Sequence, residues 1–212
     1  MKKSPVAMFL LFGAFVGCST TGGGPQAKSL FNGHDLAGWV VMYGGEWKVE
    51  DGVLVGRNGK DWSTNPAKSG SWLRTEKQYG DFILELDYAI NDGGNSGIFI
   101  RSALEKNPAF TGHELQILAD YGRQPSKGSA GSLYDVIAAT KNMSKPAGEW
   151  NHVRIVTHGR RIQITWNGEQ TIDYETDRLT QGYLGLQNHD SKSAVKFRNI
   201  RITEERSWPF GY

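Results

Sequence analysis

The chain has 212 residues, a formal net charge of +2 and a single cysteine, Cys18. This length suits one globular domain with a sizeable core plus a processing segment, and a lone cysteine excludes an intramolecular disulfide. Residues 1–17 carry two lysines and no acidic residue, so their removal leaves equal numbers of basic and acidic side chains. Without a basic excess no nucleic-acid partner is expected, and a neutral ligand is the more natural one.

The first segment has the features of a bacterial export signal. Lys2 and Lys3 precede an apolar run at 6–16 that is too short to span a bilayer as a helix. Cys18 ends the run Phe15-Val16-Gly17-Cys18, which resembles the lipobox of bacterial lipoproteins. An ordinary secretory signal with an incidental cysteine is the alternative. We expect a lipoprotein signal peptide at 1–17, acylation of Cys18 and a flexible tether at 18–28.

These assignments predict a protein of the bacterial cell envelope that is anchored to a membrane by lipid at Cys18, facing either the periplasm or the outside. The folded domain is then expected at 29–205, followed by a short tail at 206–212.

Short alternating runs predict β-strands along this domain, and helix signals are nearly absent. Asp51-Gly52 supplies the positive φ of a tight hairpin turn, and Asn167-Gly168 does so again. The run at 82–90 alternates, with Phe82, Leu84, Leu86 and Tyr88 on one face. Further strands are expected at 95–101, 113–118, 153–157, 162–166, 183–186 and 195–202. About ten to twelve strands without a βαβ rhythm predict an all-β, antiparallel β-sandwich of the jelly-roll type with few or no helices.

Six polar side chains stand within apolar strand-like runs where a plain sandwich would carry valine or isoleucine. They are Asn95, Arg101, Glu114, Gln116, Gln187 and His189. Glu114 and Gln116 are two residues apart, as are Gln187 and His189, so each pair projects from one face of its strand. A sheet face that gathers a guanidinium, a carboxylate, carboxamides and an imidazole is typical of a site for a polar ligand.

The ordered set of runs resembles the 3-keto-disaccharide hydrolase family over residues 29–204. The resemblance rests on Leu30-Phe31-Asn32-Gly33-His34-Asp35-Leu36-Ala37-Gly38-Trp39, then on the segments 47–54, 95–101, 114–118, 150–153, 182–189 and 197–202 in the family's order. It implies a concanavalin A-like fold and action on glycosides whose sugar is oxidised to a ketone at carbon 3. Where many relatives have an aspartate, this chain has Ala119, followed by Asp120. Asp120 is therefore a weaker candidate for a site residue than Glu114.

A ketone at carbon 3 acidifies the proton on carbon 2. A base can remove that proton, and the aglycone can then leave carbon 1 by elimination, after which water can add across the double bond. Such a site needs a base, an acid for the leaving group and a stabiliser of the enolate oxygen. We expect Arg101 to contact the oxyanion or a sugar oxygen, and Glu114 and His189 to be the acid and base in either order. The expected substrate-binding residues are Asn95, Gln116 and Gln187, with Trp39, Tyr134 and Asp120.

Three alternatives stay open from the sequence. Arg101 and Glu114 could form a structural ion pair within the sandwich. Glu114 and His189 could bind a divalent metal, although no close ligand-spaced cluster supports this and no cofactor is predicted. The fold also hosts lectins, so a non-catalytic carbohydrate-binding module is the alternative to an enzyme, and the seven tryptophans fit such a module.

Overall fold

The computed structural model describes residues 26–60, 62 and 67–204. The expected signal peptide, Cys18, the first part of the tether and the tail at 206–212 lie outside these residues. Within the described ranges, no helix is long and apolar enough to cross a membrane.

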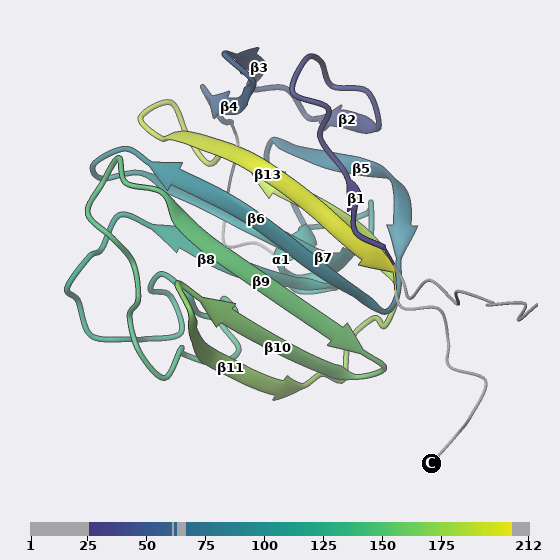
Figure 1. Cartoon of the computed structure of the whole chain (residues 1–212), viewed down its shortest axis with the longest axis vertical. Helices are drawn as coiled ribbons and strands as arrows, with labels where there is room; N and C mark the ends of the chain where they lie inside the picture. The colour runs from purple at the N-terminus through teal and green to yellow at the C-terminus, as the bar shows by residue number, and fades with distance from the viewer. Residues whose placement is uncertain (1–25, 61, 63–66, 205–212) are drawn as a thin grey trace, which may run out of the picture.

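Two antiparallel sheets form the domain (Figure 1). The larger sheet has eight strands in the order β11 (Glu169–Glu175), β10 (Arg161–Trp166), β9 (Asn151–His158), β6 (Phe82–Ile90), β13 (Ala194–Glu204), β4 (Val53–Arg57) and β3 (Glu46–Glu50), with β1 (Lys28–Ser29) paired to β13. The smaller sheet has five, in the order β2 (Trp39–Met42), β5 (Trp72–Tyr79), β12 (Gly182–Gln187), β7 (Asn95–Ser102) and β8 (His113–Leu118). The all-β antiparallel sandwich predicted from the sequence is confirmed.

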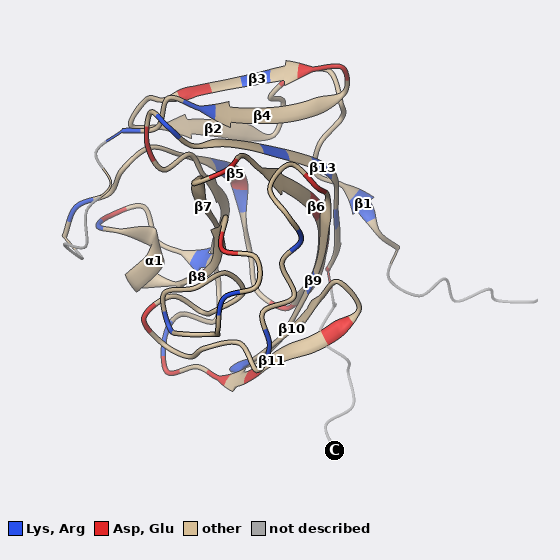
Figure 2. Ribbon diagram, turned by 90° about the vertical axis from the view of Figure 1, so that its left-hand side faces the viewer, with Lys and Arg blue, Asp and Glu red and all other residues tan. Residues whose placement is uncertain are grey.

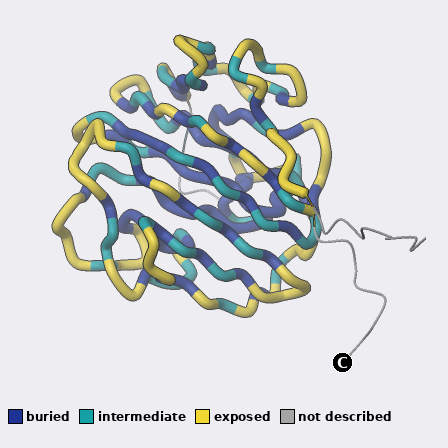
Figure 3. The backbone as a smooth tube through the Cα atoms, in the orientation of Figure 1, coloured by how far each residue is buried: buried dark blue, intermediate teal, exposed yellow. Residues whose placement is uncertain are grey.

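The strand signals in the sequence correspond closely to the observed elements. The run at 82–90 is β6, whose Phe82 and Leu84 are buried while Glu85 lies on the half-exposed face. Figure 3 shows this alternation of burial along the strands of the larger sheet. The β3–β4 hairpin turns through Asp51 and Gly52 at φ values of 50° and 76°, as its sequence predicts. The strands β1, β2 and β5 were not predicted, and no range was predicted for β11. β1 and β2 have too few residues to show a period, and the sequence of β5 does not alternate between apolar and polar residues.

One short α-helix, α1 (Pro108–Thr111), occurs in the described part of the chain, between β7 and β8. Asn107 precedes it and its side-chain oxygen accepts a hydrogen bond from the Ala109 backbone N–H at 3.0 Å. Pro108 supplies the fixed φ of a first helical residue. In the side view of Figure 2, α1 lies beyond β7 and β8 on the side away from the larger sheet.

The smaller sheet has apolar side chains on both of its faces. Ile98 and Leu115 point into the main core between the two sheets. Phe99, one residue further along β7, belongs to a second cluster with Trp72 and Ala109 on the opposite face. That outer face would be open to water in a simple sandwich, but α1 and the Trp62 side chain partly cover it. The outer face of the smaller sheet therefore holds a partly enclosed depression.

Candidate active site

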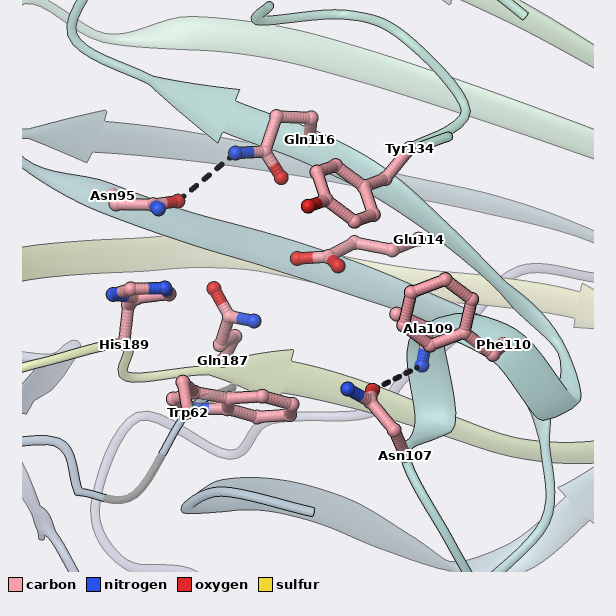
Figure 4. Close-up of a pocket in the computed structure, with 10 residues that line it drawn as sticks. All are labelled: Trp62, Asn95, Asn107, Ala109, Phe110, Glu114, Gln116, Tyr134, Gln187 and His189. Atoms are coloured by element: carbon pink, nitrogen blue, oxygen red, sulfur yellow. Dashed lines mark hydrogen bonds between the residues drawn. The ribbon is translucent and has the colours of Figure 1, made fainter. Parts of the chain in front are cut away.

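A cavity of about 230 Å³ lies on the outer face of the smaller sheet. Figure 4 shows the ten side chains that line it, which are Trp62, Asn95, Asn107, Ala109, Phe110, Glu114, Gln116, Tyr134, Gln187 and His189. Five of them belong to the six polar residues that the sequence singles out within its strand-like runs. The two-residue repeat of a strand therefore places these side chains on one face, and they meet in one pocket because β7, β8 and β12 are neighbours in the smaller sheet.

The floor of the pocket is fixed by the pairing of β7 with β8. Glu114 stands opposite Phe99, and Gln116 stands opposite Gly97. The Gln116 side-chain amide donates a hydrogen bond to the Asn95 side-chain oxygen at 3.0 Å. A side chain at Gly97 would overlap the Glu114 carboxyl group, so the space for this carboxyl depends on the glycine.

Glu114 is a carboxyl group in a largely apolar setting. Its side chain is 4% exposed, and its Oε1 atom has no hydrogen-bond partner among the described residues. Burial raises the pKa of Glu114 to about 8, and the Gln187 side chain lowers this pKa by a smaller amount. The group is therefore largely protonated at neutral pH. A carboxyl poised in this way can both donate and accept a proton.

His189 lies at the other end of the pocket, just beyond β12. Its Nδ1 atom is 2.9 Å from Oδ2 of Asp190. The other oxygen of Asp190 accepts hydrogen bonds from the backbone N–H groups of Lys192 and Ser193, both at 2.8 Å. Although burial acts in the opposite direction, the bonds from His189 and these two N–H groups lower the pKa of Asp190 to about 2. Asp190 is thus a fixed carboxylate that orients the imidazole ring.

Aromatic rings form the walls. The Trp62 ring lies nearly parallel to the His189 ring, with centroids 6.5 Å apart and an interplanar angle of 10°. Tyr134 and Phe110 meet edge to face with centroids 6.1 Å apart. Tyr134 is held beside Glu114 because its backbone N–H donates to the Glu114 carbonyl oxygen at 2.8 Å. Burial, with the nearby Glu114 carboxyl, raises the pKa of the Tyr134 hydroxyl.

Arg101 is not part of this pocket, and the prediction that it joins Glu114 and His189 in one hollow is wrong. Its side chain is fully buried and donates to the backbone oxygens of Gly80 at 2.9 Å and Gly159 at 2.7 Å. Its remaining bond, at 2.9 Å, goes to the Asp81 carboxylate. These contacts tie β7 to the turns next to β6 and β9. The ion-pair alternative was right in kind, but the partner is Asp81 rather than Glu114.

Two expected substrate-binding residues also lie elsewhere. Trp39 is buried in the main core, where its indole N–H donates to the Leu30 carbonyl oxygen at 2.7 Å. Asp120 is buried beside the loop after β8, where its carboxylate accepts hydrogen bonds from the Ala130 backbone N–H at 3.0 Å and the Asn142 side chain at 3.1 Å. Both placements correct the sequence prediction, because these side chains have structural partners and do not line the cavity.

Several residues at the site were missed from the sequence. Trp62 and Asp190 lie outside the helix and strands, and Phe110 lies in the four-residue helix α1, which is too short to show a period; none of the three has a pattern that indicates the direction of its side chain. Asp190 alone carried a usable signal, because an acidic residue next to a candidate histidine is a natural partner for its ring. Within the described ranges, no three His, Cys, Asp or Glu side chains are grouped closely enough to hold a metal ion.

Comparisons with known proteins agree with this architecture. A seed lectin from Lotus tetragonolobus superposes with a TM-score of 0.57 at 11% identity, covering 87% of this chain and all of the lectin, which shows the fold alone. The two-sheet arrangement is thus the lectin-like, concanavalin A-type sandwich that the resemblance implied.

Residues 26–203 match the 3-keto-alpha-glucoside-1,2-lyase-like domain, and the chain belongs to this family. A 3-keto-disaccharide hydrolase from Bacteroides thetaiotaomicron is 27% identical over 227 residues, which cover 82% of this chain and 77% of that protein. The crystal structure of a "Putative glycosyl hydrolase" from Parabacteroides distasonis gives a TM-score of 0.70 at 25% identity, covering 85% of this chain and 100% of that one. The family expected from the sequence motifs is confirmed.

Proposed function

We propose that this protein cleaves glycosides whose sugar carries a ketone at carbon 3. The observation that carries the proposal is the meeting, in one pocket, of the buried Glu114 carboxyl group and an imidazole held by Asp190. Family membership supports the same class of substrate. The cavity, at about 230 Å³, is smaller than the roughly 300–1,000 Å³ of pockets for drug-sized ligands. It suits a single sugar ring whose aglycone extends from the pocket.

The reaction would proceed by elimination. A base takes the proton from carbon 2, and the electron pair of that bond forms a double bond to carbon 3 as the ketone becomes an enolate. When the enolate collapses, the ketone returns, a double bond forms between carbons 1 and 2, and the bond from carbon 1 to the aglycone oxygen breaks. An acid protonates the departing aglycone. Addition of water across the new double bond would complete a net hydrolysis. Glu114 and His189 supply the acid–base chemistry.

The remaining lining suits a sugar. The carboxamides of Asn95, Gln116 and Gln187 offer donors and acceptors for hydroxyl groups, and Gln187 Oε1 is buried without a hydrogen-bond partner among the described residues. The aromatic walls of Trp62 and Tyr134 can pack against the apolar face of a ring. Mostly neutral polar groups beside aromatic surfaces are the usual lining of a small-molecule site.

Release of aglycone from a chromogenic 3-keto-glucoside, compared with the unoxidised glucoside, tests the proposal. Purified protein should release aglycone only from the oxidised substrate, and both His189→Ala and Glu114→Ala should lower the rate at least about 10²-fold. His34→Ala, at an exposed position away from the pocket, is the matched control and should keep the wild-type rate. Binding of the sugar without turnover by the wild-type protein would favour the carbohydrate-binding module instead.

We also propose, from the sequence alone, that the mature protein is anchored to the cell envelope by lipid at Cys18. Metabolic labelling with a palmitate analogue should label the wild-type protein, and Cys18→Ser should abolish the label. An unlabelled wild-type protein would favour the ordinary secretory signal.

A further inference from the structure

The described residues that line this pocket include no arginine or lysine to meet the charge of an enolate. Neither Arg nor Lys is among the ten side chains that line the cavity, and Arg101 is used elsewhere. The described lining residues that can donate to the carbon 3 oxygen as its negative charge develops are therefore neutral polar groups. Stabilisation of that kind is often the largest single contribution to catalysis. The roles assigned here to individual side chains rest on the proposed function.

The surroundings of Glu114 favour the neutral form of its carboxyl group, which can donate a hydrogen bond. It pairs with Phe99 across β7 and β8 and shares the pocket with Phe110 and Tyr134. The neutral Gln187 side chain lies close enough to act on its pKa, and the described residues place no cation against it. Burial without a compensating charge disfavours the ionised form of a carboxyl group. The unpartnered Oε1 atom leaves one side of the carboxyl group available to a ligand. A neutral carboxylic acid in an apolar site is a known way to donate to an enolate oxygen at neutral pH.

Tyr134 places a second donor beside the first. The backbone hydrogen bond between Tyr134 and Glu114 fixes the two residues next to each other, and their side chains enter the pocket together (Figure 4). The edge-to-face contact with Phe110 holds the Tyr134 ring in place. A phenol and a carboxylic acid that point into the same space can both donate to one oxygen atom.

His189 faces these donors from the other end of the cavity (Figure 4). Because the Asp190 carboxylate can only accept, the hydrogen atom of their contact belongs to His189 Nδ1. The neutral ring therefore carries its lone pair on Nε2, the nitrogen free to take a proton. Asp190 also stabilises the imidazolium ion that forms when it does.

We propose that Glu114, as a neutral carboxylic acid, and Tyr134 together donate hydrogen bonds to the enolate oxygen at carbon 3, while His189, positioned by Asp190, removes the proton from carbon 2. The electron pair of the carbon–hydrogen bond forms a double bond between carbons 2 and 3, and the π-electron pair of the carbonyl group moves onto the carbon 3 oxygen. That oxygen accepts hydrogen bonds from Glu114 and Tyr134. The proton ends on His189 Nε2, from which it can pass to the departing aglycone oxygen.

The pH dependence of kcat/KM on a 3-keto-glucoside tests the role of Glu114, because it reports ionisations in the free enzyme. If Glu114 donates, kcat/KM falls about tenfold per pH unit above pH 8 as the group ionises. Glu114→Gln keeps a neutral donor, so it should retain activity within about 100-fold of wild type at pH 7 and should lose this alkaline fall. Among the described residues that line the pocket, the titratable groups besides Glu114 are Tyr134 and His189, so Tyr134→Phe and His189→Ala are profiled in parallel.

If Glu114 is instead the base, the pH dependence of kcat/KM has the opposite sign. If Glu114 is the base, the rate rises through pH 8 and Glu114→Gln is inactive, which would overturn this inference while leaving the proposed function intact. Absence of turnover at every pH would overturn both. A second measurement does not depend on turnover: the infrared spectrum at pH 7 should contain a carboxylic acid band that Glu114→Gln removes. An unchanged spectrum would refute the neutral state.

Tyr134→Phe separates the second donor from the packing of its ring. The variant keeps the aromatic contact with Phe110, so its thermal unfolding should match the wild type. Loss of an oxyanion donor should lower kcat and kcat/KM together by about 10²-fold. Tyr121→Phe, which changes an exposed tyrosine outside the pocket, is the control. A Tyr134→Phe enzyme with wild-type kcat would contradict the assignment.

Discussion

Replacement of Gly97 by alanine is expected to displace the Glu114 carboxyl group without removing any functional group from the pocket. A methyl group on Gly97 would overlap Glu114 Oε1 and lie 2.7 Å from both Cδ and Cγ of that side chain. Ordinary van der Waals contact begins at 3.4 Å, so the glutamate must move. Gly97 does not have a positive φ, so its backbone accepts alanine without strain.

The expected consequence is a large loss of activity with a small change in stability. A misplacement of about 1 Å in a catalytic geometry can cost roughly 10²-fold in rate, and we expect at least this loss in kcat/KM. Removal of a glycine from a compatible position stabilises a fold by about 0.4–1 kcal/mol through the unfolded state. This gain opposes the cost of moving Glu114, so the free energy of unfolding should change by no more than about 1 kcal/mol.

Kinetics on a 3-keto-glucoside and urea unfolding of the same preparation measure the two quantities. Gly128→Ala is the matched control, since Gly128 also lacks a positive φ and has no atom within 4 Å of the added methyl group. It should keep the wild-type rate. A Gly97→Ala enzyme that is folded and fully active would show that the position of the Glu114 carboxyl does not matter, and would refute the reasoning.

Two further predictions concern side chains outside the pocket. Arg101→Met removes donors to two backbone oxygens and to Asp81, so it should lower the free energy of unfolding by about 3 kcal/mol while leaving kcat per folded molecule unchanged; a stable but inactive variant would contradict a structural role. Burial, with the nearby charge of Arg178, lowers the pKa of His113 from 6.5 to about 4. Because the folded state disfavours the charged ring, stability should be lost as pH falls below 6.5, by about 2 kcal/mol between pH 7 and pH 5 in urea titrations. An equal loss in His113→Gln would count against this origin.

The fold was largely predictable because its signals are local. The alternation in β6 and the Asp51-Gly52 turn each depend on a few neighbouring residues, and both appear as expected. The same period of two placed Glu114 and Gln116 on one face of β8, and the strand order brought Asn95 and Gln187 beside them. Side chains alternate regularly here because β7 and β8 pair without interruption near these residues.

The two-residue alternation of strand side chains predicts the wrong position for Arg101, and the structure shows the physical reason. Continued alternation along β7 would have put Arg101 on the same face as Asn95. Instead, the backbone at Arg101 takes a φ of 54°, and the pairing of β7 with β12 shifts register between Tyr183 and Gly185. An irregularity of this kind redirects a side chain, and it depends on the neighbouring strand rather than on the sequence of β7 itself. The contribution of Trp62 was equally hidden, because it comes from a segment outside the regular strands.

The fate of the hydrogen atom on carbon 2 tests the central claim most directly. We expect a 3-keto-glucoside with deuterium at carbon 2 to lose that label to solvent water during turnover by the wild-type protein, and to react more slowly than the unlabelled substrate in a single turnover. Mass spectrometry of the released sugar measures the loss. Complete retention of deuterium at carbon 2 would mean that the glycosidic bond breaks without proton abstraction there, and would contradict this account of the pocket.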